Sequence, residues 1–131
     1  MEAGSRLTRG GGLLAQRRGV SGEAAAARHL EGLGYAILDR NFKTRFGEID
    51  MVARDGNTTV FVEVKRREAE GHGRAAEFVT PAKMRKVVNA ARIYAARYGL
   101  SESPLRFDII AIDVIGGNEQ LVHHKGAFDA R

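Results

Sequence analysis

Two stretches of the chain carry apolar residues at the spacing of an α-helix. The first helix is expected to begin with Ser21 as its N-cap, to contain four consecutive alanines and to end near Gly32 or Gly34. The second begins at the Thr80-Pro81 pair, a capping hydroxyl followed by a proline at the first helical position, and ends at Gly99. Each of these helices can therefore pack one apolar face against a sheet.

Runs of alternating or β-branched residues predict the strands between and after these helices. The expected strands are Tyr35–Phe42, Gly47–Arg54, Thr58–Lys65 and Leu105–Val114, with Leu121–His124 as an additional edge strand. Between the second and third strands, Asp55-Gly56-Asn57 tolerates positive φ and predicts a hairpin. Arg66–Glu77 is polar and glycine-containing, as expected of a loop. The order α-β-β-β-α-β predicts an α/β fold, a mixed β-sheet flanked by helices.

Composition is that of a single globular domain. The chain has 131 residues, of which 44% are hydrophobic and 28% charged, so it can bury a core. Residues 1–20, which contain several glycines and arginines, are expected to form a flexible basic arm, and 21–131 a single domain. The absence of cysteine excludes disulfides, thiolate zinc sites and iron–sulfur clusters. No apolar run approaches the roughly 20 residues that cross a bilayer, so we expect a cytoplasmic protein without a membrane partner.

The predicted hairpin collects ionisable side chains on one face of the sheet. If Gly56 and Asn57 form a two-residue loop, Asp50 lies opposite Glu63, and Glu48 opposite Lys65. Residues two apart on a strand also share a face, so all four side chains lie together unless a β-bulge intervenes.

Two carboxylates directly opposite each other destabilise a hairpin unless their charge is compensated. A hard divalent cation compensates it, because Mg²⁺ prefers oxygen ligands, and Mn²⁺ is the expected substitute. Lys65 could then orient or deprotonate a water, or stabilise negative charge on a phosphoryl group. The alternative is a cross-strand ion pair between Glu48 and Lys65, with Asp50 and Glu63 facing solvent.

These residues also resemble those of a known family. Asp50 followed by Glu63-Val64-Lys65 resembles the PD-(D/E)xK nuclease signature, with Ile49 in place of the proline. Further segments are similar to the YraN family of endonuclease-like bacterial proteins, over about residues 17–128. They are Gly22-Glu23, Leu38-Asp39-Arg40-Asn41, Gly47-Glu48-Ile49-Asp50-Met51-Val52-Ala53, Phe61-Val62-Glu63-Val64-Lys65-Arg66-Arg67 and Arg106-Phe107-Asp108.

The resemblance implies a restriction-endonuclease-like fold, similar to that of Holliday-junction resolvases. It implies that Asp50 and Glu63 are the main Mg²⁺ ligands, that Lys65 is the catalytic lysine and that Glu23 is an additional metal-site acid. Glu48 joins this set by the hairpin argument. For Glu23 a second interpretation stays open, a favourable acid near a helix N-terminus.

The charge of the chain points to a polyanionic partner. Its 21 Lys and Arg exceed its 16 Asp and Glu by 5, and residues 81–98 carry five basic residues and no acidic one. We expect nucleic acid, with DNA preferred although residue types do not separate it from RNA, to contact Arg66, Arg67, Arg74, Lys83 and Lys86. Lys83, in the first turn of its helix, is the basic residue expected to reach the acidic cluster.

Two function classes follow from these patterns. The first is a Mg²⁺-dependent endonuclease that hydrolyses phosphodiester bonds in DNA, branched or structured DNA included. The second is a non-catalytic nucleic-acid-binding or adaptor module that keeps the fold. A homodimer is left open. His29 and the loop residue His72 are given no catalytic role, and the adjacent His123 and His124 are expected to face opposite sides of a strand.

Overall fold

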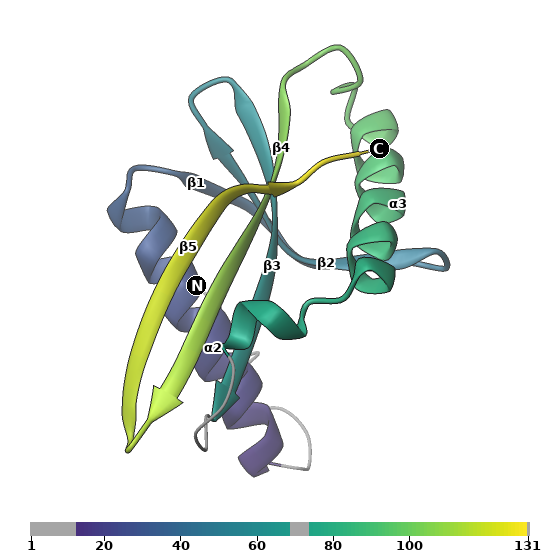
Figure 1. Cartoon of the computed structure of the whole chain (residues 1–131). Coiled ribbons are helices and arrows are strands. Elements are labelled where there is room, and N and C mark those ends of the chain that lie inside the picture. The colour runs from purple at the N-terminus through teal and green to yellow at the C-terminus, as the bar shows by residue number, and fades with distance from the viewer. Residues whose placement is uncertain (1–12, 69–73, 131) are drawn as a thin grey trace.

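The protein is described by a computed structural model that covers residues 13–68 and 74–130, with side chains described from residue 22 onward. The chain forms a five-stranded sheet with helices on both faces (Figure 1). In chain order the elements are α2 (Leu13–Gly32), β1 (Ala36–Thr44), β2 (Gly47–Asp55), β3 (Thr58–Glu68), the 3₁₀ helix η1 (Ala75–Phe78), α3 (Pro81–Arg97), β4 (Leu105–Ile115) and β5 (Asn118–Phe128). Among the residues described, no helix has an apolar stretch that could span a membrane.

The sheet is mixed, as the sequence predicts. Its strand order is β1-β2-β3-β4-β5, and every neighbouring pair is antiparallel except β3 and β4, which run parallel. The connection between these two carries η1 and α3, because parallel neighbours need a crossover. The fold class is therefore α/β with a sheet between helices.

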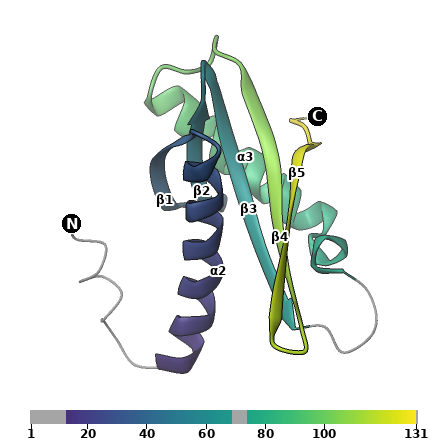
Figure 2. The same ribbon diagram turned by 90° about the vertical axis from the view of Figure 1, so that its left-hand side faces the viewer.

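Each face of the sheet has its own core, and the two helices lie on opposite sides (Figure 2). On one face, Ala26, Ala27 and Leu30 of α2 pack on small and β-branched residues of the strands. On the other, α3 covers an aromatic cluster that includes Phe61 and Tyr94, whose ring centroids are 5.8 Å apart. Burial on both faces explains why β4 is mostly apolar and why β3 carries an apolar segment, Val60-Phe61-Val62, at its buried centre.

The first helix is longer than predicted. It begins at Leu13 rather than at Ser21, so the last part of the predicted basic arm is helical. The stretch from Leu13 to Arg18 consists of good helix formers, and their propensity outweighs the cost of the glycines that follow. The rest of the predicted arm, residues 1–12, lies outside the described residues, as does His72 of the predicted loop.

Three other expectations are corrected. β5 extends over Asn118–Phe128, well beyond the expected edge strand, because it pairs with β4 along most of its length. The predicted loop after Lys65 is shorter, since β3 continues to Glu68 and η1 occupies part of the remainder. The helical spacing of Tyr94 and Tyr98 predicts that both pack in the core, but Tyr98 is 53% exposed because it follows the last residue of α3.

The β2–β3 hairpin has the predicted register only in its first half. Pairing runs from Asp55↔Thr58 to Met51↔Val62 and then stops, so Asp50↔Glu63 and Glu48↔Lys65 are not paired. Beyond this point the Asp50 side chain takes the place of the ladder and accepts a hydrogen bond from the Val64 N–H. Asp50 and Glu63 are therefore not opposed in the strand ladder, although their side chains still interact.

Gly47 fixes β2 beneath α3. A Cβ atom at this position would lie 2.0 Å from the Lys86 carbonyl oxygen, so only glycine allows the strand to approach the helix backbone this closely. The contact holds the start of β2 against the first turns of α3 and thereby positions the side chains around Asp50.

Candidate active site

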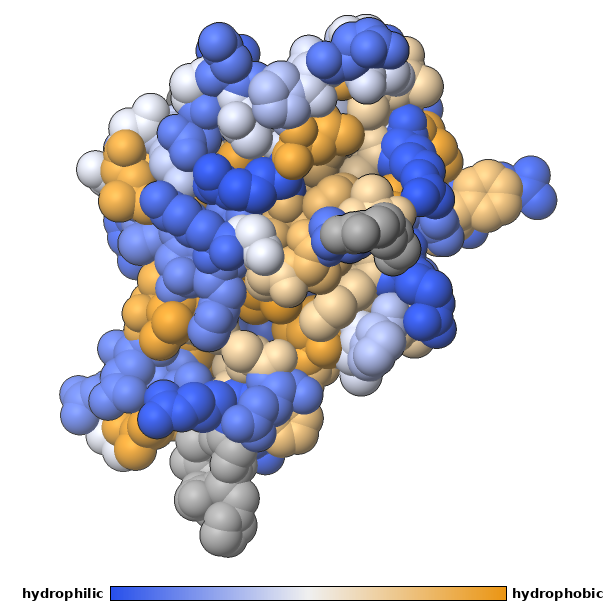
Figure 3. Space-filling view, turned by 45° about the horizontal axis from the view of Figure 1, so that its top comes forward, coloured by the Kyte–Doolittle hydropathy of each residue, from blue (hydrophilic) through white to orange (hydrophobic). Residues whose placement is uncertain are grey.

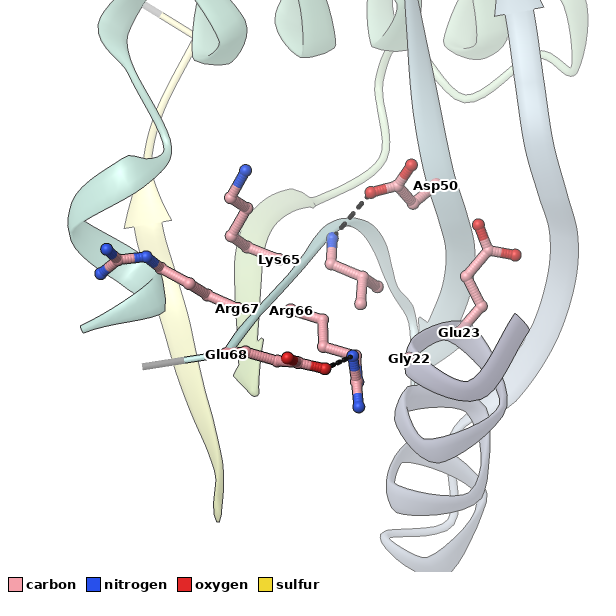
Figure 4. A pocket seen from close by; sticks show the side chains of 8 residues that line it. Gly22, Glu23, Asp50, Lys65, Arg66, Arg67 and Glu68 are labelled. Carbon is pink, nitrogen blue, oxygen red and sulfur yellow. Dashed lines mark hydrogen bonds and ion pairs between the residues drawn. The ribbon is translucent and has the colours of Figure 1, made fainter. Parts of the chain in front are cut away.

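Asp50 and Glu63 form the centre of the site, at the point where β2 and β3 separate. Asp50 accepts a hydrogen bond from the Val64 N–H at 2.8 Å, and a side-chain hydrogen bond between Asp50 and Glu63 contributes to the raised pKa of Glu63. Glu63 is 6% exposed, and a dashed line at Asp50 in Figure 4 marks the hydrogen bond that this carboxylate accepts. The hairpin therefore brings together the two carboxyl groups that the sequence predicts as a pair.

Burial changes the acidity of both groups. It raises the pKa of Glu63 to about 8, helped by repulsion from Asp50 and opposed by Lys83. Burial also raises the pKa of Asp50, while the hydrogen bond from Val64 opposes the rise. Because two buried carboxylates cannot both ionise without compensation, the pair shares a proton at neutral pH.

Lys83 joins the site from α3, as predicted from its place in the first helical turn. Its Nζ lies 4.0 Å from Glu63 Oε2 and 3.7 Å from Glu48 Oε2. Thr80 caps the helix through a 3.1 Å hydrogen bond from the Lys83 N–H, which fixes this turn. The predicted partner of Glu48 was Lys65, and the structure gives it Lys83 instead.

One oxygen of the pair stays unsatisfied. Among the described residues, Glu63 Oε1 is buried and has no hydrogen-bond partner. A buried carboxyl oxygen in this state costs free energy and calls for a ligand. Lys65, two residues along β3, shares the face of Glu63 by strand alternation, and within the described part of the chain it forms no ion pair. An uncommitted lysine and an uncommitted oxygen therefore lie on the same face.

Glu23 approaches Asp50 from the other helix. Both line a cavity of about 500 Å³ between α2 and β3, and their side chains are neighbours in Figure 4. Burial raises the pKa of Glu23, and a hydrogen bond from Asn41 opposes this. Since α2 begins at Leu13, Glu23 lies well inside the helix, and the interpretation as an acid near the N-terminus is wrong.

The four predicted metal-site acids are neighbours but do not form one shell. In the parts of the chain that the structure describes, no group of three or more His, Cys, Asp or Glu side chains is arranged to hold a metal ion. Asp50 and Glu63 are in contact, while Glu48 is engaged by Lys83 and Glu23 by Asn41. The arrangement provides two adjacent oxygen donors and two more acids close to them.

The predicted nucleic-acid contacts lie in three places around this centre. Arg66 and Arg67 line the cavity beside Asp50. Arg66 lies next to Gly22 of α2, and it is 3.5 Å from Glu119 of β5 and 3.8 Å from Glu68 of its own strand. Arg67 stacks on the Phe78 ring at 3.8 Å. Lys86 is exposed on α3 near the hairpin tip, and Arg74 is exposed ahead of η1. Lys83 contacts two of the predicted metal-site acids, Glu48 and Glu63.

A second polar cluster, centred on Asp108, escaped the sequence reasoning. Asp108 is 0% exposed and accepts hydrogen bonds from Arg106, from His123 at 2.7 Å and from the Gly126 N–H. These contacts lower its pKa to about 2 against the effect of burial. His29 extends the cluster to α2, with its Nε2 3.0 Å from His123 Nδ1. His124 is exposed, so the two adjacent histidines do face opposite sides.

Comparison with known proteins gives a consistent result. A sequence model of the uncharacterised protein family UPF0102 matches residues 22–112, which include every element from the second half of α2 into β4. A UPF0102 protein of Geobacter sulfurreducens is 47% identical over 106 residues, covering 81% of this chain and 83% of that protein. One from Anaeromyxobacter dehalogenans is 45% identical over 114 residues, covering 87% and 85%. One from Persephonella marina is 40% identical over 112 residues, covering 86% and 93%. The chain therefore belongs to UPF0102, the YraN family that its motifs resemble.

Proposed function

We propose that this protein is a metal-dependent phosphodiester hydrolase acting on nucleic acid, with the restriction-endonuclease-like fold and PD-(D/E)xK site that its motifs resemble. The observation that carries the proposal is the Asp50–Glu63 pair. Among the described residues, Glu63 Oε1 has no hydrogen-bond partner, and Lys65, whose charge acts on Glu63, forms no ion pair. Two buried acids in contact are costly to the fold, and such a cost is typical of a site kept for function.

The donor set suits Mg²⁺ or Mn²⁺. Asp50 and Glu63 supply adjacent oxygen atoms, and Glu63 Oε1 has no other partner among the described residues. Mg²⁺ is usually held by one or two carboxylates together with water and substrate phosphate, so a pair of adjacent carboxyl groups suits this ion. Glu23 and Glu48, whose charges act on Asp50, would hold water molecules of such a shell. When bound, the ion would lower the pKa of a water molecule and offset charge on the phosphoryl group.

The protein's own residues have separate roles in this proposal. Glu63 must lose its proton before it binds a cation, so binding is favoured as the pH rises toward 8. Lys65 contacts the scissile phosphate and stabilises the negative charge that develops on it. Lys83 holds Glu48 and Glu63 in place and lowers the pKa of Glu63, which eases the loss of the proton.

The proposal is tested by cleavage assays on junction, flap and single-stranded DNA with Mg²⁺ or Mn²⁺. Asp50→Asn and Lys65→Ala should each lower the rate by at least about 100-fold, while the exposed control Glu31→Gln should match the wild type. Circular dichroism and thermal unfolding show whether each variant is folded. Equal cleavage by the wild type and both site variants would refute the assignment.

One observation favours a second function, a non-catalytic nucleic-acid-binding module. The Lys83 ammonium already lies beside Glu48 and Glu63 and compensates part of their charge without a metal. Calorimetry with Mn²⁺ separates the two proposals. Salt-sensitive DNA binding without any heat of metal binding would favour the binding module over the hydrolase.

A further inference from the structure

The β1–β2 hairpin ends in an exposed aromatic side chain. Phe46 is 56% exposed, a larger fraction than for any other large hydrophobic side chain that the structure describes. The hairpin extends past α3 in Figure 1, and in Figure 3 an apolar patch lies at this projecting end among hydrophilic side chains. The Arg45 guanidinium lies over the Phe46 ring, 5.2 Å from its centroid.

The tip is held rigidly. One hydroxyl, Thr44 Oγ1, accepts hydrogen bonds from the Phe46 N–H at 3.0 Å and the Gly47 N–H at 3.1 Å. It also donates one to the Gly47 carbonyl oxygen at 2.8 Å. Gly47 is in turn seated against the α3 backbone at Lys86. Phe46 is therefore presented to solvent by a fixed turn, and binding through its ring costs little ordering entropy.

The surroundings of the tip are cationic and adjoin the acidic pair. Phe46 and Glu48 line the same cavity, of about 460 Å³, together with four basic residues, Lys43, Arg45, Lys83 and Lys86. Four positive charges against the one of Glu48 leave a net charge of +3. Of these cations, only Lys83 has an acidic partner within the described residues, so the others are available to phosphates.

We propose that the hairpin tip Lys43–Gly47 binds a nucleic-acid strand by stacking Phe46 on an unpaired base while Lys43, Arg45 and Lys86 bind the flanking phosphates. An aromatic face recognises any base that is free to stack, and cations supply affinity that does not depend on sequence. A base within a continuous duplex has no free face. The tip therefore selects strands with unpaired bases over blunt duplex. This inference rests on the proposed function, because it names the class of nucleic acid that the same site would bind.

The test measures binding in EDTA, so that it is independent of cleavage. The chain has no tryptophan, so Phe46→Trp introduces a single tryptophan and keeps an aromatic ring at the tip. Tyr98→Trp places the single tryptophan at the far end of α3, at another exposed aromatic position, and is the matched control. The probes are a hairpin duplex with a single-stranded tail, made once with a DNA tail and once with an RNA tail, and the same duplex with a blunt end.

We expect the tailed duplex to quench the tryptophan at position 46 and to leave that at position 98 unchanged. Anisotropy should show that Phe46→Ala binds the tailed duplex about tenfold more weakly and the blunt duplex as the wild type does, with Phe46→Leu intermediate. The tail that quenches more strongly identifies the preferred strand. Equal quenching at both positions, equal loss of affinity for tailed and blunt duplex, or no binding would overturn the proposal. If the tailed duplex quenches the tryptophan at position 46 but the protein cleaves no nucleic acid, the proposed hydrolase activity is refuted and base stacking is not. If the protein cleaves nucleic acid without this quenching, base stacking is refuted and the hydrolase activity is not.

Discussion

Replacing Glu63 by glutamine tests the energetics of the acidic pair directly. Glutamine has the shape of a protonated glutamic acid, and its amide N–H can donate to Asp50 as that acid does. In the wild type, the pKa of Glu63 is raised by burial from 4.5 to about 8. A raised pKa means that the folded state binds the proton more tightly than the unfolded chain. The resulting stability is complete below pH 4.5 and is lost as the pH rises through 8.

The size of the effect follows from this interval. At pH 7 the unfolded chain has released the proton of Glu63 and the folded protein retains it. Between pH 4.5 and pH 7 the free energy of unfolding therefore falls by about 3 kcal/mol relative to its value at low pH. Glu63→Gln has no proton to lose at this position. We therefore expect its free energy of unfolding at pH 7 to exceed that of the wild type by about 3 kcal/mol. Near pH 5 the two should differ by less than about 1 kcal/mol.

Urea unfolding in EDTA at pH 5, 6, 7 and 8 measures this difference. Glu31→Gln, which removes an exposed carboxyl from α2, serves as the control and should stay parallel to the wild type. If the free energies of unfolding of Glu63→Gln and the wild type also differ by a constant amount across this pH range, the pair does not retain a proton and the predicted pH dependence is wrong. Adding Mg²⁺ at pH 8 should stabilise the wild type, by about 2.7 kcal/mol at 100 times its Kd, and leave Glu63→Gln nearly unchanged.

Three further predictions concern the neighbours of this pair. Lys83→Met should raise the pKa of Glu63 above its value in the wild type, because the ammonium favours the ionised carboxyl, and the same pH series of urea titrations measures the change. Gly47→Ala should lower the free energy of unfolding by more than about 2 kcal/mol in urea titrations, because a Cβ atom cannot fit against the Lys86 backbone. A change of less than about 0.5 kcal/mol, which is typical of surface substitutions, would contradict this contact. Stability should fall by about 2 kcal/mol as the pH drops from 4 to 2, because the pKa of Asp108 is lowered to about 2, and acid titrations of Asp108→Asn should lack this component.

The sequence predicts the acidic pair well because the chemistry is local. Asp50 and Glu63 are separated by one tight turn, and the residues around Gly56 specify that turn. Strand alternation then decides which face each side chain takes. The prediction fails where this regularity ends. The residues of β2 that precede Met51 do not pair with β3, and Gly47 at the start of this segment lies against the backbone of α3. This contact with a helix distant in the sequence is not visible in any local pattern.

The Asp108 cluster shows the opposite case. Its partners Arg106, His123 and His29 come from β4, β5 and α2, and only the tertiary fold brings them together. One signal was present in the sequence. Asp108 stands in an otherwise apolar run that is buried on both faces, and a carboxylate in such a strand requires partners. The sequence identifies the need for a partner but not the residues that meet it.

The single parallel junction of the sheet has a consequence for how the site assembles. Asp50 and Glu63 are joined by a hairpin, a structure that closes within microseconds, whereas Lys83 arrives only when α3 docks across the parallel pairing of β3 and β4. The two acids therefore belong to a local hairpin, whereas the site is complete only once the crossover between β3 and β4 has formed. The burial that raises the pKa of Glu63 is likewise a property of the assembled fold and not of the hairpin alone.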